Sequence, residues 1–438
     1  MDYWTRRNYA TETDARILAR HPAMNALLEE FRADAGLGKL HAQAVQWHKD
    51  RIAYLLEQPD YKQLFDDLIA PGRPDALQIS KEAEESGGED ADDDAPSRAA
   101  AVPDGDTGTS TSDLHLRPAA PLTSLKLVSA PASAATRPVH ERFRDATDHA
   151  RKSKGFLWEG GDNALMFTPR SKRLVVAFDN VSIAREEGQR WPWGFKVLGQ
   201  DMGCSVLGVM GAQRNWFRNE FVHDAFEALR DQGFFEQFDE ILFYGASMGG
   251  YGALAYQACA PGSNVLAIAP QSTLSRRILP NEDRWGWTTK LDWEGRYSDI
   301  AGTTDSAGKV FVIADPYYKP DYDQVSRITG DNVTWLHTPF MGHQLPNAFL
   351  VMGILKDLLY AAVGGTLDER LFYRLFRARN DLPRYQHDLL MHAEARGKIR
   401  SAIRVCEYTL KKRKAGNMKR SLERLQAELG DQMKAAAE

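Results

Sequence analysis

Between about residue 155 and residue 363 the chain alternates short apolar runs with amphipathic segments, and this alternation constrains the fold more than any other feature. The apolar runs are rich in Val, Ile, Leu and Phe, which is typical of strands that are buried on both faces. They are ALMF (164–167), LVVAF (174–178), CSVLGVM (204–210), EILFYG (240–245), NVLAIAP (264–270), KVFVIAD (309–315) and NVTWLHTP (332–339). Helical patterns lie at 216–230, 247–260 and 344–363. Together they predict an α/β fold, in which a mostly parallel sheet is covered by helices on both faces.

The segments that flank this pattern predict a different organisation. Residues 1–80 carry apolar residues at three- and four-residue spacing, which predicts a helical N-terminal region. Residues 81–137 are acidic and rich in Gly, Pro, Ser and Ala, and such a composition predicts a disordered linker because it buries too little apolar surface to offset the entropy of ordering. The sheet is expected in 138–365, and 366–438 is expected to be helical and basic. The helical ends are where we expect any protein partner to bind.

The overall composition argues against several classes of protein. The 438 residues carry a formal net charge of −5, so nothing favours a nucleic-acid partner. The three cysteines are far apart and odd in number, which predicts neither a disulfide framework nor a zinc site, and we expect no metal and no organic cofactor. The sequence has no run of about 18 apolar residues that would span a membrane, and its start lacks the apolar core of a signal peptide. The simplest expectation is a cytoplasmic protein.

The pentapeptide Gly245-Ala246-Ser247-Met248-Gly249 carries the strongest chemical signal. The pattern G-x-S-x-G is common by chance, but here a buried-strand pattern precedes it and a helix rich in small residues follows it. A sharp turn from strand to helix presents the serine hydroxyl at the carboxyl edge of the sheet, and small residues at 245, 249 and 250 allow backbone to approach closely. Ser247 is therefore predicted to be a nucleophile. The alternative is a glycine-rich helix start that serves packing alone.

A serine nucleophile needs a base, and the base needs an acid to orient it. We call the sharp strand-to-helix turn at Ser247 the elbow. In proteins with such a turn, the acid precedes the base along the chain. His343 lies in a loop directly after the last predicted strand, where the base is needed, and is favoured over His337, which lies within that strand. Asp321 and Asp315 are the two candidates for the acid. Asp321 is preferred because it lies deeper in the loop, whereas Asp315 at the strand end could serve to cap a turn.

An oxyanion hole needs two N–H donors aimed at the developing negative charge. The amide of Met248, directly after the nucleophile, is the first candidate. The second is Asn180, which follows the strand at 174–178 and could donate through its backbone or its side chain. The alternative for Asn180 is an Asx-type turn after the strand.

Residues 271–299 follow the strand after the elbow helix and are expected to form a small cap over the nucleophile. Trp285, Trp287 and Arg284 are the predicted substrate-binding residues in this cap. Tryptophan faces and arginine forks suit sugar rings, aromatic acyl groups and anionic groups. The alternative is that these side chains brace the cap without contacting a substrate.

With these pieces in place, residues 156–363 resemble bacterial α/β-hydrolase-like proteins, a mostly uncharacterised, serine-hydrolase-like branch of the α/β-hydrolase superfamily. The matching pieces are VVAFDN, WPWGF, NWFRN, FYGASMGGYGAL, APQSTL, ADPYYKPD and the GH of MGHQLP. The resemblance implies a Ser-Asp-His triad at Ser247, Asp321 (or Asp315) and His343, and it implies no particular substrate.

The function predicted from these residues is that of a serine hydrolase, an esterase or deacylase. It would form an acyl-enzyme on Ser247, with His343 as base, and act on a small-molecule or carbohydrate acyl ester. One alternative is an acyltransferase that uses the same triad and replaces water with an alcohol or amine. Another is a non-catalytic hydrolase-like scaffold that binds a partner.

Overall fold

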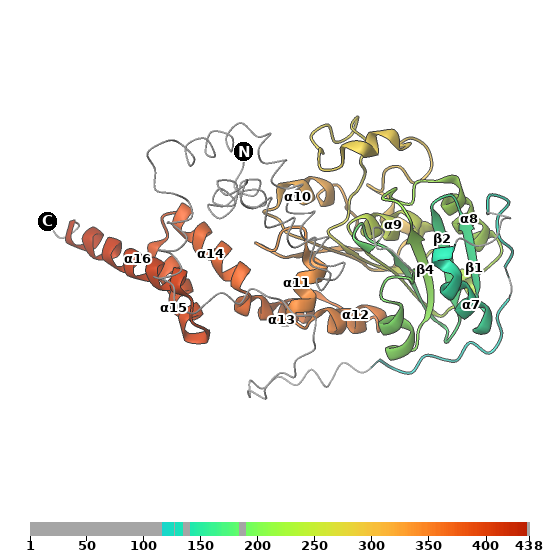
Figure 1. Ribbon diagram of the computed structural model, residues 1–438, viewed down its shortest axis with the longest axis horizontal. Helices are drawn as coiled ribbons and strands as arrows, with labels where there is room; N and C mark the ends of the chain where they lie inside the picture. Colours follow the sequence, from blue (N-terminus) through green and yellow to red (C-terminus); the bar gives the residue numbers. More distant parts are fainter. Residues whose placement is uncertain (1–115, 127, 135–140, 184–189, 436–438) are drawn as a thin grey trace, which may run out of the picture. The chain divides into compact units, whose positions relative to one another are not determined.

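The computed structural model describes residues 116–126, 128–134, 141–183 and 190–435, all of which belong to the unit Gly108–Glu438. The predicted helical region at 1–80 and most of the predicted linker lie outside these residues. Within them, one eight-stranded sheet is the centre of the fold (Figure 1). Its strands are β1 (Phe156–Gly160), β2 (Asn163–Thr168), β3 (Arg173–Phe178), β4 (Ser205–Gly211), β5 (Glu240–Ala246), β6 (Asn264–Ile268), β7 (Val310–Ala314) and β8 (Val333–His337).

The order of the strands across the sheet is β1-β2-β4-β3-β5-β6-β7-β8. The pairs β1–β2 and β2–β4 are antiparallel, and every other pair is parallel. The predicted α/β class with a mostly parallel sheet is therefore confirmed. Sequence analysis missed β1, because Glu159 and Gly160 interrupt its apolar pattern; pairing of Phe156 with Phe167 of β2 holds it in the sheet.

Helices cover both faces of this sheet. They are α7 (Arg144–Lys152), α8 (Glu220–Asp231), α9 (Met248–Tyr256), α10 (Lys319–Val325), α11 (Leu345–Val351) and α12 (Leu355–Val363). In β3, Leu174 and Val176 belong to one hydrophobic cluster with α8 and α9, whereas Val175 and Ala177 belong to a second cluster with α7 and α12. Both faces of the strand are thus buried, which explains why the apolar runs in the sequence are nearly continuous.

The single helix expected at 344–363 is two helices, α11 and α12, which meet at a bend of 108°. Gly353, with φ of +71°, lies in the three-residue break between them. In the part of the chain that the structure describes, no individual helix has the length and apolar character to cross a membrane; α11 and α12 reach that threshold only when counted together across their bend.

The last part of the predicted linker is packed against the sheet domain. The amide of Lys172 donates a hydrogen bond of 2.8 Å to the carbonyl of Ala120. Leu122, Leu125 and Val128 pack on the hydrophobic cluster that contains α8 and α9. The prediction of disorder for 81–137 therefore does not hold for these residues, because a composition averaged over the whole range hides a short apolar stretch that can be buried.

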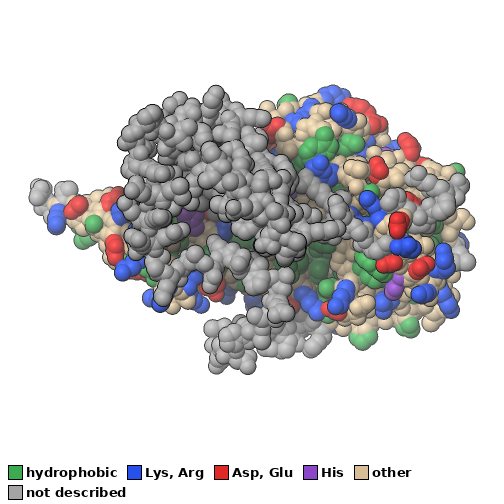
Figure 2. Space-filling view, in the orientation of Figure 1, with side chains coloured by type: hydrophobic (Ala, Val, Ile, Leu, Met, Phe, Trp, Pro, Cys, Tyr) green, Lys and Arg blue, Asp and Glu red, His purple; other side chains and the backbone are tan. Residues whose placement is uncertain are grey.

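Four more α-helices follow α12 along the chain: α13 (Glu369–Leu375), α14 (Pro383–Ala395), α15 (Ile399–Lys412) and α16 (Gly416–Ala435). The last three share a small core that includes Leu390, Ala402 and Leu425. Where the described residues are visible in Figure 2, their surface carries charged side chains of both signs, interspersed. Helix α14 also reaches the sheet domain, since the ring of His392 lies 4.8 Å from that of Phe340.

Candidate active site

Ser247 lies at the turn between β5 and α9, in a backbone conformation that non-glycine residues rarely adopt. Its φ is 53° and its ψ is −118°. The turn is held because the Ser247 amide donates a 2.8 Å hydrogen bond to the carbonyl of Ile268 in β6. The glycines on either side are required: a side chain at Gly245 would overlap the carbonyl of Gly249, and one at Gly249 would lie 2.6 Å from the carbonyl oxygen of Phe178. Backbone strain of this kind is concentrated at functional sites.

The structure brings Ser247, His343 and Asp321 together, and we call these three residues the triad below. Nε2 of His343 lies 3.0 Å from Oγ of Ser247, and Nδ1 lies 2.8 Å from Oδ2 of Asp321. An ionised carboxylate only accepts, so Nδ1 carries the ring proton and Nε2 is free to accept from the serine hydroxyl. The Asp321 side chain is 0% exposed and the His343 side chain 18%. The chain of hydrogen bonds therefore runs from a fully buried carboxylate to a serine that is half-buried.

Asp321 lies in the first turn of α10, not in an irregular loop as the sequence suggested. Burial alone would raise the pKa of its carboxyl. Electrostatic interactions with His343 and Arg284, together with hydrogen bonds from both side chains, outweigh that effect and lower the pKa. The carboxylate is therefore held ionised, as a group that orients an imidazole must be.

Asp315, the other candidate acid, makes a different set of contacts. Its Oδ1 accepts from the Tyr317 amide at 2.8 Å and its Oδ2 from the Gly342 amide at 2.7 Å. Burial raises the pKa of Asp315, although these amide hydrogen bonds lower it in part. The carboxylate thus joins the end of β7 to the loop that carries His343.

His337, the less favoured base, lies at the exposed end of β8. Its ring stacks on that of Trp335, with centroids 4.4 Å apart. Its backbone amide donates a hydrogen bond to the hydroxyl of Tyr373 in α13. His337 therefore contacts Trp335 and Tyr373 at the edge of the sheet, and not Ser247.

The two candidate oxyanion donors lie on segments that touch each other. Met248 is the first residue of α9, where amides have no acceptor within the helix. The backbone before Asn180 packs on the elbow, since a side chain at Gly249 would also lie 2.9 Å from the Asp179 carbonyl oxygen. Oδ1 of Asn180 accepts from the Ser182 amide at 2.9 Å, so the Asx-type turn considered as the alternative is present.

A buried ion pair anchors the loop that begins at Asn180. Arg190 Nη2 lies 2.9 Å from Oδ2 of Asp179, and both side chains are almost wholly buried. Oδ1 of Asp179 also accepts from the Trp193 amide at 3.2 Å. Burial raises the pKa of Asp179 to about 7, against the lowering effect of the Arg190 charge. The pair fixes the two ends of this loop against the sheet.

Arg284, predicted to bind substrate, is directed at the triad acid. Its Nη1 lies 2.6 Å from Oδ1 of Asp321, and its Nε donates to Glu282 at 2.8 Å. Its side chain is 14% exposed. Nη2 of Arg284 also donates a hydrogen bond of 3.1 Å to the carbonyl of Pro320. The guanidinium is thus engaged with the acid and its surroundings.

The two predicted tryptophans lie at different depths. The Trp285 ring is half-buried, 6.1 Å from the ring of His343 and 5.2 Å from that of Trp216. Trp287 is 36% exposed, and the guanidinium carbon of Arg214 lies 4.1 Å from its ring centre. Trp285 therefore lies beside His343, whereas Trp287 is more exposed.

Gln271, a fully buried residue next to Ser247, was not among the residues predicted for the site. Its Nε2 lies 3.4 Å from Oγ of Ser247, and its Oε1 accepts from Nε1 of Trp216 at 2.9 Å. An indole N–H only donates, and this fixes which end of the amide faces the serine. The backbone at Trp216 and Phe217 has φ of 50° and 56°, a second strained turn at the same edge of the sheet. The sequence signals were the position of Gln271, shortly after the strand that follows the elbow helix, and its place in the APQSTL piece of the family resemblance.

The cap is tied down by Arg218, which precedes α8. Its guanidinium donates to three backbone carbonyls of the cap, those of Asp292 at 2.9 Å, of Glu294 at 3.0 Å and of Arg296. These bonds hold the second half of the cap against the sheet domain.

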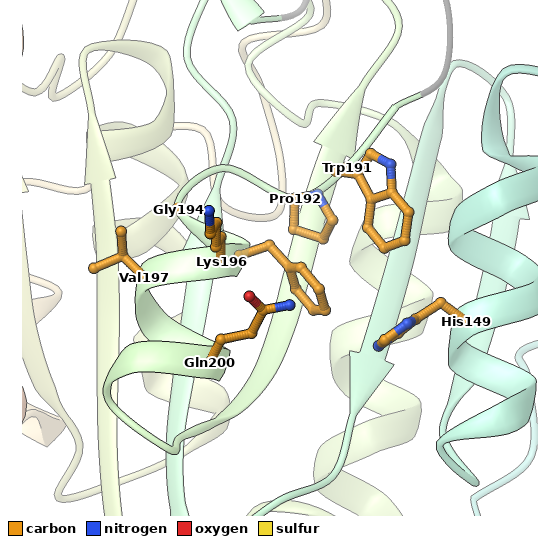
Figure 3. Close-up of a pocket in the computed structure, with 8 residues that line it drawn as sticks. His149, Trp191, Pro192, Gly194, Lys196, Val197 and Gln200 are labelled. Atoms are coloured by element: carbon orange, nitrogen blue, oxygen red, sulfur yellow. The ribbon is translucent and has the colours of Figure 1, made fainter. Parts of the chain in front are cut away.

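A separate cavity of about 440 Å³ lies between α7 and a single-turn π-helix at Lys196–Asp201 (Figure 3). His149 and Trp191 meet edge to face at its wall, with ring centres 5.5 Å apart. Its described lining contains no member of the triad. Elsewhere, among the residues that the structure describes, no three His, Cys, Asp or Glu side chains are grouped so that they could hold a metal ion.

No protein-family model matches the sequence, and neither does any curated protein. Among solved structures, similarity is found to the capsule O-acetyltransferase of Neisseria meningitidis serogroup A, with 11% identity over 50% of this chain and 93% of that chain and a TM-score of 0.33. An alpha-beta serine hydrolase homologue from Coxiella burnetii gives 14%, 49%, 96% and 0.30 for the same measures. Carboxyl esterase 2 from the fungus Tuber melanosporum gives 16%, 51%, 83% and 0.31. At these values the case for function rests on the geometry of the site.

Proposed function

We propose that this chain is a serine hydrolase, an esterase or deacylase that works through an acyl-enzyme on Ser247. The observation that carries the proposal is the unbroken chain of contacts from Ser247 Oγ to His343 Nε2, at 3.0 Å, and from His343 Nδ1 to Asp321, at 2.8 Å. A strained serine between a buried strand and a helix supports the same conclusion.

In the proposed first half-reaction, His343 takes the hydroxyl proton as Ser247 Oγ forms a bond to the acyl carbon of the ester. The negative charge that develops on the carbonyl oxygen is stabilised by the amide of Met248 and by an N–H of Asn180. Asp321 stabilises the imidazolium that forms. The tetrahedral intermediate collapses when the bond to the leaving alcohol breaks and His343 returns its proton to the alcohol oxygen. The acyl group then remains on Ser247.

In the second half-reaction, His343 removes a proton from water, and the resulting oxygen attacks the acyl carbon. Collapse of this intermediate breaks the bond to Ser247 Oγ, which recovers a proton from His343 and leaves a carboxylic acid. The substrate class we propose is an acyl ester of a small molecule or a carbohydrate. Support comes from the Trp285 ring beside the base, since aromatic faces pack well against sugar and acyl groups.

The proposal is tested by treating the purified protein with a fluorophosphonate probe and locating the adduct by mass spectrometry. We expect a covalent adduct on Ser247, none in Ser247→Ala, and strongly slowed labelling in His343→Ala. His337→Ala is the matched control and should label like the wild type, because His337 lies at the exposed sheet edge. Absence of labelling under conditions where a control hydrolase reacts would leave the scaffold alternative.

A second arm of the experiment decides between water and an alcohol as the acyl acceptor. The wild-type protein is given a nitrophenyl acyl ester with and without added monosaccharide, and the products are separated by mass. Free carboxylic acid as the main product supports the hydrolase. An acylated sugar that forms in preference to the free acid would convert the assignment to the acyltransferase alternative, which shares the first half-reaction.

A further inference from the structure

The Asp321 carboxylate is contacted by His343 and by one residue of the cap, Arg284. Oδ1 of Asp321 is contacted by both Nδ1 of His343, at 3.0 Å, and Nη1 of Arg284, at 2.6 Å. In a Ser-Asp-His arrangement the carboxylate needs only the imidazole as its cationic partner. Here a permanent positive charge competes with the imidazolium for the same oxygen.

Arg284 is in turn neutralised by Glu282 from the same cap. Nε of Arg284 lies 2.8 Å from Oε1 of Glu282, and Nη2 also contacts this carboxylate. The Glu282 side chain is also held by Gln324, whose Nε2 donates a 2.9 Å hydrogen bond to Oε2 of Glu282. Gln324 lies on α10, as Asp321 does, so that the acid and the cap pair are built on one helix. Burial would lower the pKa of Arg284, but these two carboxylates raise it, so the guanidinium keeps its charge.

Other charged and polar groups around the imidazole come from every neighbouring element. The ring of Tyr318, from the segment before α10, lies 6.3 Å from that of His343. Asp315, at the end of β7, bonds the amide next to His343, and Arg384 of α14 lies within electrostatic range of Asp315. The Asp321 carboxylate itself is hydrogen-bonded by His343 and Arg284. The local charge at the acid is therefore set by Asp321, Arg284 and Glu282.

We propose that Arg284 and Glu282 are positioning residues that act through Asp321 to set the pH range in which His343 works as a base. Arg284 weakens the pull of Asp321 on the imidazolium, and Glu282 weakens the effect of Arg284. The cap is thereby part of the electrostatics of the triad, so this inference rests on the proposed function and deepens it.

The signs of the expected effects follow from counting charges. Three charges, −1 on Asp321, +1 on Arg284 and −1 on Glu282, leave a net −1 beside the imidazole. Removing the charge of Arg284 makes the net charge −2, which favours the imidazolium. As the pH is lowered, the base is therefore lost at a higher pH than in the wild type. Removing the charge of Glu282 makes the net charge 0 and extends activity to lower pH. Removing both leaves the net charge at −1. A single charge at this range is worth about one pH unit.

The test measures the rate of fluorophosphonate labelling of Ser247 against pH in the full-length wild type, in Arg284→Met, Arg284→Lys and Glu282→Gln, in the double variant Glu282→Met with Arg284→Met, and in one control variant. We expect the acid limb to move up by about one pH unit in Arg284→Met and down in Glu282→Gln. It should stay near the wild-type position in Arg284→Lys, which keeps the charge, and in the double variant. Arg277→Met, which breaks the exposed cap pair with Glu294, is the matched control and should shift nothing.

Opposite shifts in the two single variants distinguish this role from a purely structural one, which would lower the rate without moving the limb. Equal shifts of the same sign, or unmoved limbs with reduced rates, would overturn the inference. If Arg284→Met does not fold, Glu282→Gln and the double variant still decide the question. Failure of the proposed function has a different signature, because then wild-type Ser247 would not be labelled at any pH.

Discussion

The substitution Asp321→Asn tests the chemistry of the triad most directly, because the structure fixes which way the new amide must turn. Arg284 has no acceptor atom, so it requires the amide oxygen where Oδ1 of Asp321 lies now, 2.6 Å from Nη1. The amide NH₂ then faces Nδ1 of His343. This contact forces Nδ1 to accept and places the ring proton on Nε2, where it can no longer receive the proton of the Ser247 hydroxyl.

The size of the expected effect follows from that change of tautomer. An imidazole held in the wrong tautomer lowers the rate of a serine triad by about 10⁴-fold. At about 1.36 kcal/mol per factor of ten, this corresponds to roughly 5.5 kcal/mol of lost transition-state stabilisation. We expect the second-order rate of fluorophosphonate labelling to fall by that order.

Asp315→Asn is the matched control, because Asp315 is an equally buried carboxylate on the neighbouring segment. Both its oxygens accept amide N–H groups, from Tyr317 and Gly342, and an asparagine can satisfy only one of them. The unsatisfied amide should cost about 1–3 kcal/mol in the free energy of unfolding, measured by urea denaturation. Its labelling rate should fall far less than that of Asp321→Asn. The reasoning is refuted if Asp321→Asn labels within tenfold of the wild type, or if the two variants exchange their effects.

Three further expectations concern the elbow, the cap and a buried histidine. Gly249→Ala should lose about 1–3 kcal/mol of unfolding free energy and most labelling, because the added methyl would overlap the carbonyl oxygens of Phe178 and Asp179. Gly286→Ala is the control: the space around Gly286 is open, so this variant should match the wild type in both assays. Arg218→Met should make the cap residues 292–296 cleavable in limited proteolysis, and an unchanged digestion pattern would contradict the clamp. Burial lowers the pKa of His223 to about 4, so the unfolded chain binds its proton first as pH falls from 6.5. Wild-type stability should therefore decrease between pH 6.5 and 4, and His223→Phe should lack that component in urea titrations at each pH.

Local patterns in the sequence were sufficient for seven of the eight strands and for the sharp turn at Ser247. Buried strands such as 174–178 carry apolar residues on both faces, and this short-range signal does not depend on which strand lies beside which. The elbow at Ser247 is also local, since glycines at 245 and 249 are needed wherever a strand turns that sharply into a helix. The position of His343 followed from the order of strand, loop and helix along the chain.

Contacts between distant segments were decided by the tertiary structure alone. Asp315 and Asp321 were both candidates from the sequence, with Asp321 preferred for its place in the chain. The packing of α10 directs Asp321 toward the imidazole, whereas Asp315 binds backbone amides. Arg284 beside two tryptophans resembles a substrate contact, yet it pairs with an aspartate 37 residues away. Gln271 reaches Ser247 because β5 and β6 are neighbours in the sheet. Spacing in sequence predicts which segments become strands and helices, whereas the partner of a side chain depends on how the crossovers stack those segments, and residue periodicity carries no information about that.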